Sequence, residues 1–444
     1  MKKLPAAMHK TAIAMNETAT TKHKSAIAMQ KSAILLMAAV ACAALLFGCD
    51  SGRNATLTVW CAEMDREVVT AMVNDFMAAK PAIKGVNVEI CEDDHTREKF
   101  EGDPAAAADV ICIPHDQLGA LASQGYLHEI SGGAHVGAIN ENTAASVKAG
   151  QFDGKQYGFP SSFETHMLFY DKTIISDAAA RTLEGIVGSG TGSGAGGSAG
   201  GAGSGAGALP EDGAILFGMD FANAYFTANW FYTYGCLLFG ENGEDSSFCD
   251  FDSAGGIAAM TYLIENRELF GNMNGELAQE LFAQRRLGAY IGGPWNAAAF
   301  TEALKGNYGC AMLPSVDGRE MRSFAGIKLY CVNANTKNKD VAMDLAAWLT
   351  SPDNQKARFQ ARNLVPVSLS LADDIDVAVS TTAKAVMAQG ANAVPMPSIS
   401  EMSNFWDPTG DFTLACYMGE VDISDLPREL SKLAATIKGT SQAP

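Results

Sequence analysis

Apolar residues in the first part of the chain follow two alternating spacings, one typical of strands and one typical of helices. Leu57–Cys61 is a short run of mainly β-branched and aromatic residues, which predicts a buried strand. In Arg66–Ala79 the apolar side chains recur every three or four residues, which predicts an amphipathic helix. The pattern continues with a strand at Val86–Ile90, a charged helical stretch to Phe100, a strand at Asp109–Ile113 and a helix at Gln117–Gln124. Strand–helix alternation of this kind predicts a parallel α/β sheet.

Polar residues directly follow two of these strands. Glu63 and Asp65 come after the first strand, and His115 and Asp116 come after the third. Ligands of open α/β sheets bind at the carboxyl ends of the strands, so we expect these side chains on one rim of the sheet. Further along, helical spacing returns in three segments, Gly255–Ile264, Glu276–Arg285 and Val341–Leu349. The run Leu287–Ile291 predicts a strand, and the turn Gly292–Trp295 after it should begin another helix.

A tract of almost pure Gly, Ser and Ala interrupts the middle of the chain at Gly188–Gly207. Such a segment buries too little apolar surface to offset its ordering entropy, so we expect it to be disordered. It is either a linker between domains, with a root-mean-square span of roughly 25 Å, or an insertion within one domain.

The N-terminal segment has the parts of an export signal: lysines, then the apolar run Ala33–Gly48, then small residues. Leu46–Cys49 resembles the lipobox of bacterial lipoproteins, in which Cys49 is lipidated and residues 1–48 are removed. The alternative is a transmembrane anchor. Sixteen residues at about 1.5 Å each reach about 24 Å, short of the roughly 30 Å hydrocarbon core. We therefore expect a protein held outside the cytoplasmic membrane by its lipid alone.

The formal charge of the 444-residue chain is −18, and residues 1–48 hold six lysines and one glutamate, which leaves −23 on the remainder. A strongly acidic body repels phosphate backbones and anionic headgroups, which argues against nucleic acid as a partner. Nearly 400 residues after the signal should divide into two lobes.

The eight cysteines after Cys49 form no CxxC pair, which disfavours a zinc site, and they are Cys61, Cys91, Cys112, Cys236, Cys249, Cys310, Cys331 and Cys416. We favour buried free thiols over a disulfide framework, whose pairing the sequence does not assign. The histidines also lack metal-ligand spacing, so we expect neither a metal nor a cofactor.

Short motifs spread through the chain carry a resemblance to one family. They are Leu57–Trp60, His115–Gly119, Gln124–Leu127, Gly154–Pro160, Glu164, Phe169–Lys172, Tyr225–Thr227, Gly293–Trp295, Asn307–Gly309, Leu313–Pro314, Pro395–Pro397 and Phe405–Trp406. In this order, they resemble the maltose/maltodextrin-binding branch of the extracellular solute-binding proteins that serve ABC importers.

The resemblance implies an α/β, two-lobed periplasmic-binding-protein-like fold with hinge strands and a ligand cleft between the lobes. The implied bounds are 49–163 plus 329–375 for the first lobe and 164–323 plus 376–444 for the second, with chain crossings near Ser162–Thr165 and Phe324–Tyr330. The tract 188–207 then falls inside the second lobe, which favours an insertion. The implied partners are an oligosaccharide of maltose or maltodextrin type and a membrane-embedded ABC permease, with the protein acting as a monomer.

Sugars present apolar C–H faces and hydroxyl rims, so their sites need aromatic platforms and carboxylates. The resemblance assigns the platforms to Tyr225, Trp295 and Trp406. It assigns the carboxylates to Asp116 and Glu164, with Glu63 or Asp65 less securely aligned. Each has a structural alternative: the aromatic residues as core, and Asp116 as the cap of the helix at Gln117. We assign the other tryptophans to packing, and they are Trp60, Trp230 and Trp348.

Three departures from the family pattern bear on the choice of sugar. Gln117 stands where the family often has arginine, Ile113 where it often has tryptophan, and Asn223 where it has an acid. These changes leave another oligosaccharide open as the ligand.

Two other classes of function compete with a binding protein. A secreted glycosidase needs two carboxylates about 5 to 9.5 Å apart, and no local motif singles out such a pair. Outside the Gly-rich tract no GxSxG motif is present, so a hydrolase of that type is unsupported and we expect no catalytic residues. An adhesive lipoprotein would use the Gly-rich tract as a stalk, but it gives the cleft motifs no purpose.

Overall fold

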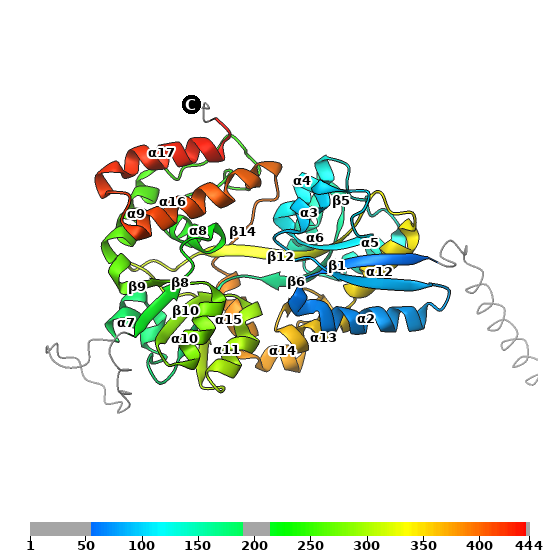
Figure 1. The fold of residues 1–444 in the computed structure, drawn as a ribbon, viewed down its shortest axis with the longest axis horizontal. Coiled ribbons are helices and arrows are strands. Elements are labelled where there is room, and N and C mark those ends of the chain that lie inside the picture. Colours follow the sequence, from blue (N-terminus) through cyan, green and yellow to red (C-terminus); the bar gives the residue numbers. More distant parts are fainter. Residues whose placement is uncertain (1–54, 190–213, 441–444) are drawn as a thin grey trace, which may run out of the picture. The chain divides into compact units, whose positions relative to one another are not determined.

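Two separate β-sheets organise residues 55–189 and 214–440, which are the parts that the computed structural model describes (Figure 1). The proposed signal 1–48, the lipidation site Cys49 and residues 190–207 of the Gly-rich tract lie outside these ranges.

The first sheet is built from β13, β6, β12, β3, β1 and β2 in that order, and β14 also pairs with β12. The bounds are β1 Thr56–Cys61, β2 Gly85–Ile90, β3 Val110–Pro114, β6 Gly158–Glu164, β12 Ser323–Val332, β13 Val365–Pro366 and β14 Ala393–Pro395. Its helices are α2 Arg66–Ala79, α3 Thr96–Gly102, α4 Leu118–Ser123, α5 Gly133–Ile139, α6 Ala144–Ala149, α12 Lys339–Leu349 and α13 Pro352–Arg362. A small hairpin of β4 Gln151–Phe152 and β5 Lys155–Gln156 lies between α6 and β6.

The second sheet has the order β11, β7, β10, β8, β9. The bounds are β7 Met167–Asp171, β8 Ile215–Met219, β9 Phe270–Asn272, β10 Leu287–Gly292 and β11 Tyr308–Ala311. Its helices are α7 Leu183–Gly188, α8 Ala224–Thr233, α9 Ala254–Asn266, α10 Gly275–Ala283, α11 Ala297–Ala303, α14 Ile375–Val379, α15 Thr381–Gly390, α16 Trp406–Met418 and α17 Leu426–Ile437. Figure 1 shows the two sheets in two lobes, with the long strand β12 running between them.

The helix and strand predictions from hydrophobic spacing are confirmed. The predicted helix at Arg66–Ala79 is α2, and its apolar stripe of Val69, Met72, Val73 and Phe76 is buried. Among the residues assigned to packing, Trp60 and Trp230 are buried, and Trp348 packs against Phe76 with ring centroids 6.0 Å apart. All eight cysteines of the described residues are free, seven of them buried, as the sequence favoured.

The expectation of a parallel sheet is only partly right. β1 pairs with β2 and β3 in parallel, but β12 runs antiparallel to both β3 and β6. The cause is the path of the chain. The carboxyl ends of β1 and β3 face the second lobe, so a strand that arrives from that lobe must run in the opposite direction.

The chain passes from the first sheet to the second between Glu164, the last residue of β6, and Met167, the first of β7. The β12 strand makes the return passage beside it. Thr165 fixes the two passages together: its hydroxyl oxygen lies 2.8 Å from that of Ser323 and donates to the carbonyl of Phe324 at 2.6 Å.

The described flanks of the Gly-rich tract, α7 and β8, both belong to the second lobe. Gly188 is the last residue of α7, so this helix extends one residue into the tract expected to be disordered. Within the described residues, no helix combines the length and the apolarity needed to cross a bilayer.

Candidate functional site

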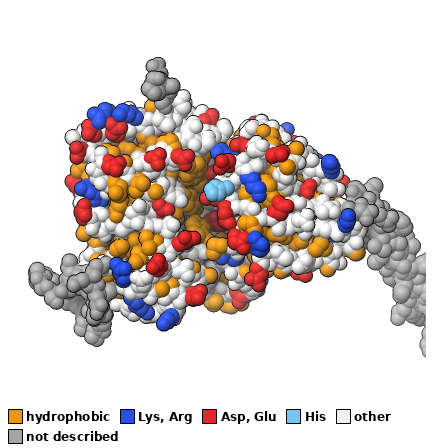
Figure 2. Space-filling view, viewed as in Figure 1, with side chains coloured by type: hydrophobic (Ala, Val, Ile, Leu, Met, Phe, Trp, Pro, Cys, Tyr) orange, Lys and Arg blue, Asp and Glu red, His pale blue; other side chains and the backbone are white. Residues whose placement is uncertain are grey.

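The carboxyl ends of β1 and β3 meet on one rim, as the sequence predicts. The two strands are parallel neighbours, with Val59 opposite Val110. A short 3-10 helix follows each strand: η1 Glu63–Asp65 after β1 and η2 His115–Gln117 after β3. Figure 2 shows a hollow between the two lobes, with acidic side chains gathered within it and hydrophobic ones along one wall.

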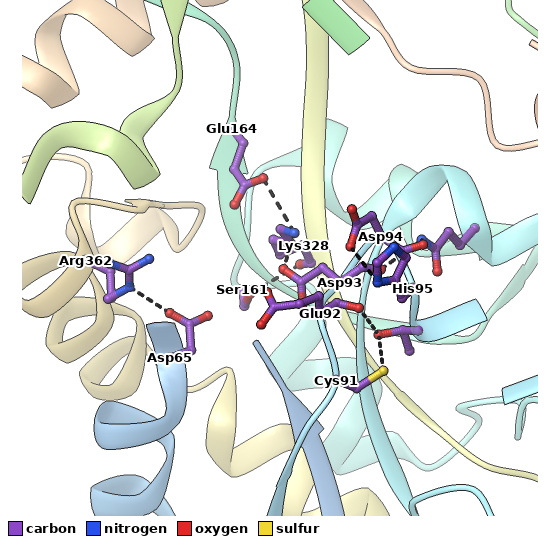
Figure 3. Close-up of polar contacts among 12 residues, drawn as sticks. Asp65, Cys91, Glu92, Asp93, Asp94, His95, Ser161, Glu164, Lys328 and Arg362 are labelled. Carbon is purple, nitrogen blue, oxygen red and sulfur yellow. Dashed lines mark hydrogen bonds and ion pairs between the residues drawn. The ribbon is translucent and has the colours of Figure 1, made fainter. Parts of the chain in front are cut away.

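Glu164 lies at the lobe crossing, on the floor of this region. It is the last residue of β6 and is buried. Burial raises the pKa of its carboxyl group to about 7, while the charge of Lys328 on β12 acts to lower it. The Lys328 ammonium nitrogen is 3.9 Å from Glu164 Oε2 and contacts the carboxylate of Asp93, in the loop after β2 (Figure 3).

Asp116 is buried within η2, close enough to Lys328 for their charges to interact. Burial raises the pKa of its carboxyl group to about 6. Asp116 does not occupy the cap position of η2 or α4, which Pro114 and Gln117 hold, and its Oδ1 atom has no hydrogen-bond partner within the described residues. The backbone amides of Asp116 and Gln117 act to lower the pKa of this carboxyl group, so an interaction with the helix start and a role in ligand binding both stay predictions.

His115, next to Asp116, is a structural anchor. Its Nδ1 accepts a hydrogen bond from the Ile327 amide at 3.1 Å, so its Nε2 carries the proton and donates to the Met396 carbonyl at 2.9 Å. Burial lowers the pKa of His115 to about 4. One neutral imidazole thus joins η2, β12 and the segment after β14.

The two acids after β1 differ in their surroundings. Asp65 is buried and its Oδ1 lies 3.0 Å from Arg362 Nε at the end of α13 (Figure 3). Glu63 is exposed and pairs with Arg66 at 2.7 Å on the same turn. Asp65 lies close enough to Glu164 for their charges to interact, whereas Glu63 lies at the exposed rim.

The three predicted aromatic platforms form a row on the second lobe. The Tyr225 ring centroid is 6.1 Å from that of Trp295 and 6.0 Å from that of Phe324, with which it stacks at 10°. Phe324 in turn lies 6.0 Å from Trp406. Tyr225, Trp295 and Trp406 are each partly exposed, whereas Phe324 is buried behind them.

The row approaches the carboxylates at the hinge strand. A Cβ atom on Gly326 would lie 3.7 Å from the Tyr225 hydroxyl and 3.8 Å from the Glu164 Cβ. Tyr225 and Glu164 therefore both lie against the hinge strand at Gly326, where a Cβ atom would make only ordinary van der Waals contacts. The charge of Glu164 adds to burial in raising the pKa of Tyr225, which keeps its hydroxyl protonated as a donor.

Sequence reasoning missed Lys328, Asp93 and Arg362. A signal for Lys328 was available, because it is the only charged residue in the apolar strand β12 Ser323–Val332. Asp93 and Arg362 gave no such signal. Asp93 stands among other charged residues in the sequence and Arg362 ends a polar helix, so only the fold places them near Glu164.

The three departures from the family pattern have local structural roles. Gln117 Nε2 donates to the carbonyl of Asp93 at 2.9 Å and so holds the loop that carries this aspartate. Ile113 is fully buried in the core. Asn223 caps α8, with its Oδ1 accepting from the Tyr225 amide at 2.9 Å.

Residues 55–189 and 214–440 contain no group of three His, Cys, Asp or Glu side chains that is placed to hold a metal ion. His115 and His166 lie in the interior, and His95 lies on the surface.

Comparisons with known proteins agree with this geometry. The galactooligosaccharide-binding protein of Bacillus subtilis is 29% identical over 412 residues, which cover 88% of this chain and 91% of that protein. The maltooligosaccharide ABC transporter solute-binding lipoprotein of Streptococcus pneumoniae is 29% identical over 335 residues, covering 71% and 72%. The crystal structure of MalX from Streptococcus pneumoniae in complex with maltopentaose superposes with a TM-score of 0.74 at 25% identity, covering 87% of this chain and 100% of that one.

A family assignment follows from the match over most of the chain, and it confirms the resemblance drawn from the sequence motifs. Residues 71–388 match the bacterial extracellular solute-binding proteins. The chain therefore belongs to this family, as a solute-binding protein and not an enzyme.

Proposed function

We propose that this chain is the sugar-capturing component of an ABC importer, which closes its two lobes over a maltodextrin-type oligosaccharide and delivers it to a membrane-embedded permease. The observation that carries the proposal is the row Tyr225, Trp295 and Trp406, which meets the carboxylates of Glu164 and Asp116 beside the hinge strands.

The chemistry of this pairing suits a sugar. Aromatic faces pack against the apolar C–H faces of a pyranose, while carboxylates accept short, strong hydrogen bonds from its hydroxyls. Within this proposal Asp65 lies beside the pocket, held by Arg362, and Glu63 contributes only at the rim.

The type of oligosaccharide has two candidates. A maltodextrin is favoured by the names of several relatives and by the structure of MalX with maltopentaose. A galactooligosaccharide is favoured by the name of the Bacillus subtilis relative. Ile113 and Gln117 depart from the maltodextrin pattern in the first lobe, which keeps the second candidate in the test.

The remaining parts of the proposal concern how the protein is held and divided. A lipid on Cys49 tethers a monomer outside the membrane, in keeping with the relative named a lipoprotein. The lobes comprise 49–163 plus 329–375 and 164–323 plus 376–444, with 188–207 as an insertion in the second lobe.

The test measures binding and closure together. The mature chain is titrated with maltotriose, maltopentaose and galactooligosaccharides in a calorimeter, and the bound states are compared by solution scattering. We expect saturable binding of one class, no consumption of the sugar, and a smaller radius of gyration with ligand. Sugar hydrolysis, or binding without compaction, would contradict the closing receptor.

A further inference from the structure

Lys328 occupies an unusual place for a lysine. Its side chain is only 16% exposed, and it projects from the strand that links the two lobes. Burial opposes its charge, yet Asp93 and Glu164 together raise its pKa well above the usual value, so the ammonium group stays charged. A buried cation is costly unless it is paired, so its partners explain why the residue is tolerated.

The register of the hinge strands places Lys328 beside Glu164. In this antiparallel pair, Gly326 lies opposite Glu164, and Lys328, two residues later in β12, lies opposite Ser162, two residues earlier in β6. Glu164 and Lys328 are therefore diagonal neighbours on one face of the sheet, within reach of long side chains. The pairing shifts between Lys328 and Leu329, and such a bulge redirects the side chain beside it.

The same lysine also holds a loop of the first lobe. Its ammonium group contacts Asp93 Oδ2, and Gln117 Nε2 donates a hydrogen bond to the backbone carbonyl of Asp93. The second carboxylate oxygen, Asp93 Oδ1, is buried and has no hydrogen-bond partner within the described residues. Asp116 Oδ1 is in the same condition nearby. The carboxylates around the Lys328 ammonium group therefore have acceptor oxygens without a hydrogen-bond partner among the described residues. Such oxygens suit a ligand that brings hydroxyl donors.

We propose that Lys328 is the positioning residue of the sugar site, holding the carboxylates of Glu164 and Asp93 as charged acceptors for ligand hydroxyls. The inference rests on the proposed function. It adds a residue outside the predicted site set, which acts on sugar through its two acidic partners.

The charges around Glu164 determine the pH dependence that we expect for sugar binding. The groups that act on Glu164 come from four elements besides its own, and they are Lys328, Asp93, Asp65 and Arg362, with Tyr225 and Asp116 at the edge of the same cluster. Glu164 accepts best when ionised, so affinity for sugar should fall as the pH drops through about 7. Removing the ammonium charge should move that fall to higher pH.

The experiment measures the Kd of the full mature chain for maltopentaose, or for the galactooligosaccharide if that is the ligand, between about pH 5.5 and pH 9. For Lys328→Met we expect the pH midpoint to rise by about one unit, so that binding near pH 7 is about fivefold weaker. Lys328→Arg should restore the unsubstituted profile. The control is Lys80→Met, which removes a lysine paired with Asp344 on the first lobe, away from the hinge, and should leave the profile unchanged.

A double substitution separates positioning from a merely structural role. Once Glu164→Gln has removed the carboxylate that titrates near pH 7, the profile should keep only the fall near pH 6 that Asp116 causes, and adding Lys328→Met should have little further effect near pH 7. A midpoint near pH 7 that persists in Glu164→Gln contradicts the inference even if Lys328→Met does not fold. So does an unshifted midpoint in a folded Lys328→Met variant. A chain that binds no oligosaccharide at any pH contradicts the proposed function itself, and this inference with it.

Discussion

His115 should make folding stability depend on pH in a way that one substitution removes. The imidazole is buried and neutral, bonded to the Ile327 amide and the Met396 carbonyl. Its pKa in the folded chain is about 4, against about 6.5 for an unperturbed histidine. Below pH 6.5 the unfolded chain therefore binds a proton that the folded chain does not. Stability is lost as the pH falls from about 6.5 to about 4.

The magnitude follows from the two pKa values. Between about pH 7.5 and about pH 5, the unfolded histidine becomes almost fully protonated while the folded one stays neutral, which corresponds to a loss of about 2 kcal/mol. Asp116 and Glu164 act in the opposite direction, because their raised pKa values let the folded chain take up protons over the same range. The pH dependence of the whole protein is therefore a sum, and only a difference between variants isolates His115.

The assay is urea unfolding of the unsubstituted chain and of His115→Asn at both pH values. The asparagine keeps an acceptor for the Ile327 amide but does not titrate. We expect the variant to be less stable at the higher pH and to recover about 2 kcal/mol relative to the unsubstituted chain at the lower one. Ile327→Val is the matched control: it should destabilise by about 1 kcal/mol and keep the full pH dependence. Equal pH dependence in His115→Asn and the unsubstituted chain would refute the reasoning.

Three further outcomes are expected. Trp406→Ala should weaken oligosaccharide binding roughly tenfold, from about 60 Å² of sugar surface at about 25 cal/mol per Å²; Trp230→Ala, which removes a fully buried ring, should instead cost ~3–5 kcal/mol of stability in denaturant melts. Cys49→Ala should abolish metabolic labelling with fatty acid, and persistent labelling would contradict the lipid anchor. Shortening residues 190–207 to a few residues should change stability by about 1–2 kcal/mol at most, since closure entropy varies slowly with loop length; loss of sugar binding in a folded deletion variant would make the tract part of the site.

Local patterns were enough to predict most elements of the fold. The strand β1 and the helix α2 follow from spacings within fewer than fifteen residues, and the rim after β1 and β3 follows from their parallel pairing. The antiparallel partner of β3 did not follow, because β12 lies about two hundred residues further along. No pattern within β3 distinguishes a partner that arrives from the other lobe.

In the site, too, the residues within local motifs could be predicted, and those brought together by distant segments could not. Tyr225 and Trp295 stand in recognisable motifs, and the fold brings their rings within 6.1 Å. The charges that surround Glu164 come from segments that share no motif, and Asp93 and Lys328 are separated by more than two hundred positions. Burial strengthens the electrostatic interactions between these charges, and the burial of one side chain depends on every element packed around it.

In the proposed cleft, the residues on the hinge strands and the residues on the two lobes have different roles. Glu164 and Lys328 are held at fixed spacing by the ladder between β6 and β12, so their geometry does not depend on how far the lobes are open. Tyr225 and Trp295 belong to the second lobe, whereas Asp116 belongs to the first, so the lobe closure that we propose would change the distance across the site. Under the proposed function, a sugar that enters the open cleft would therefore meet Glu164 and Lys328 already at their final spacing. It gains contact with both walls only on closure, and the free energy of those later contacts is what can hold the closed state.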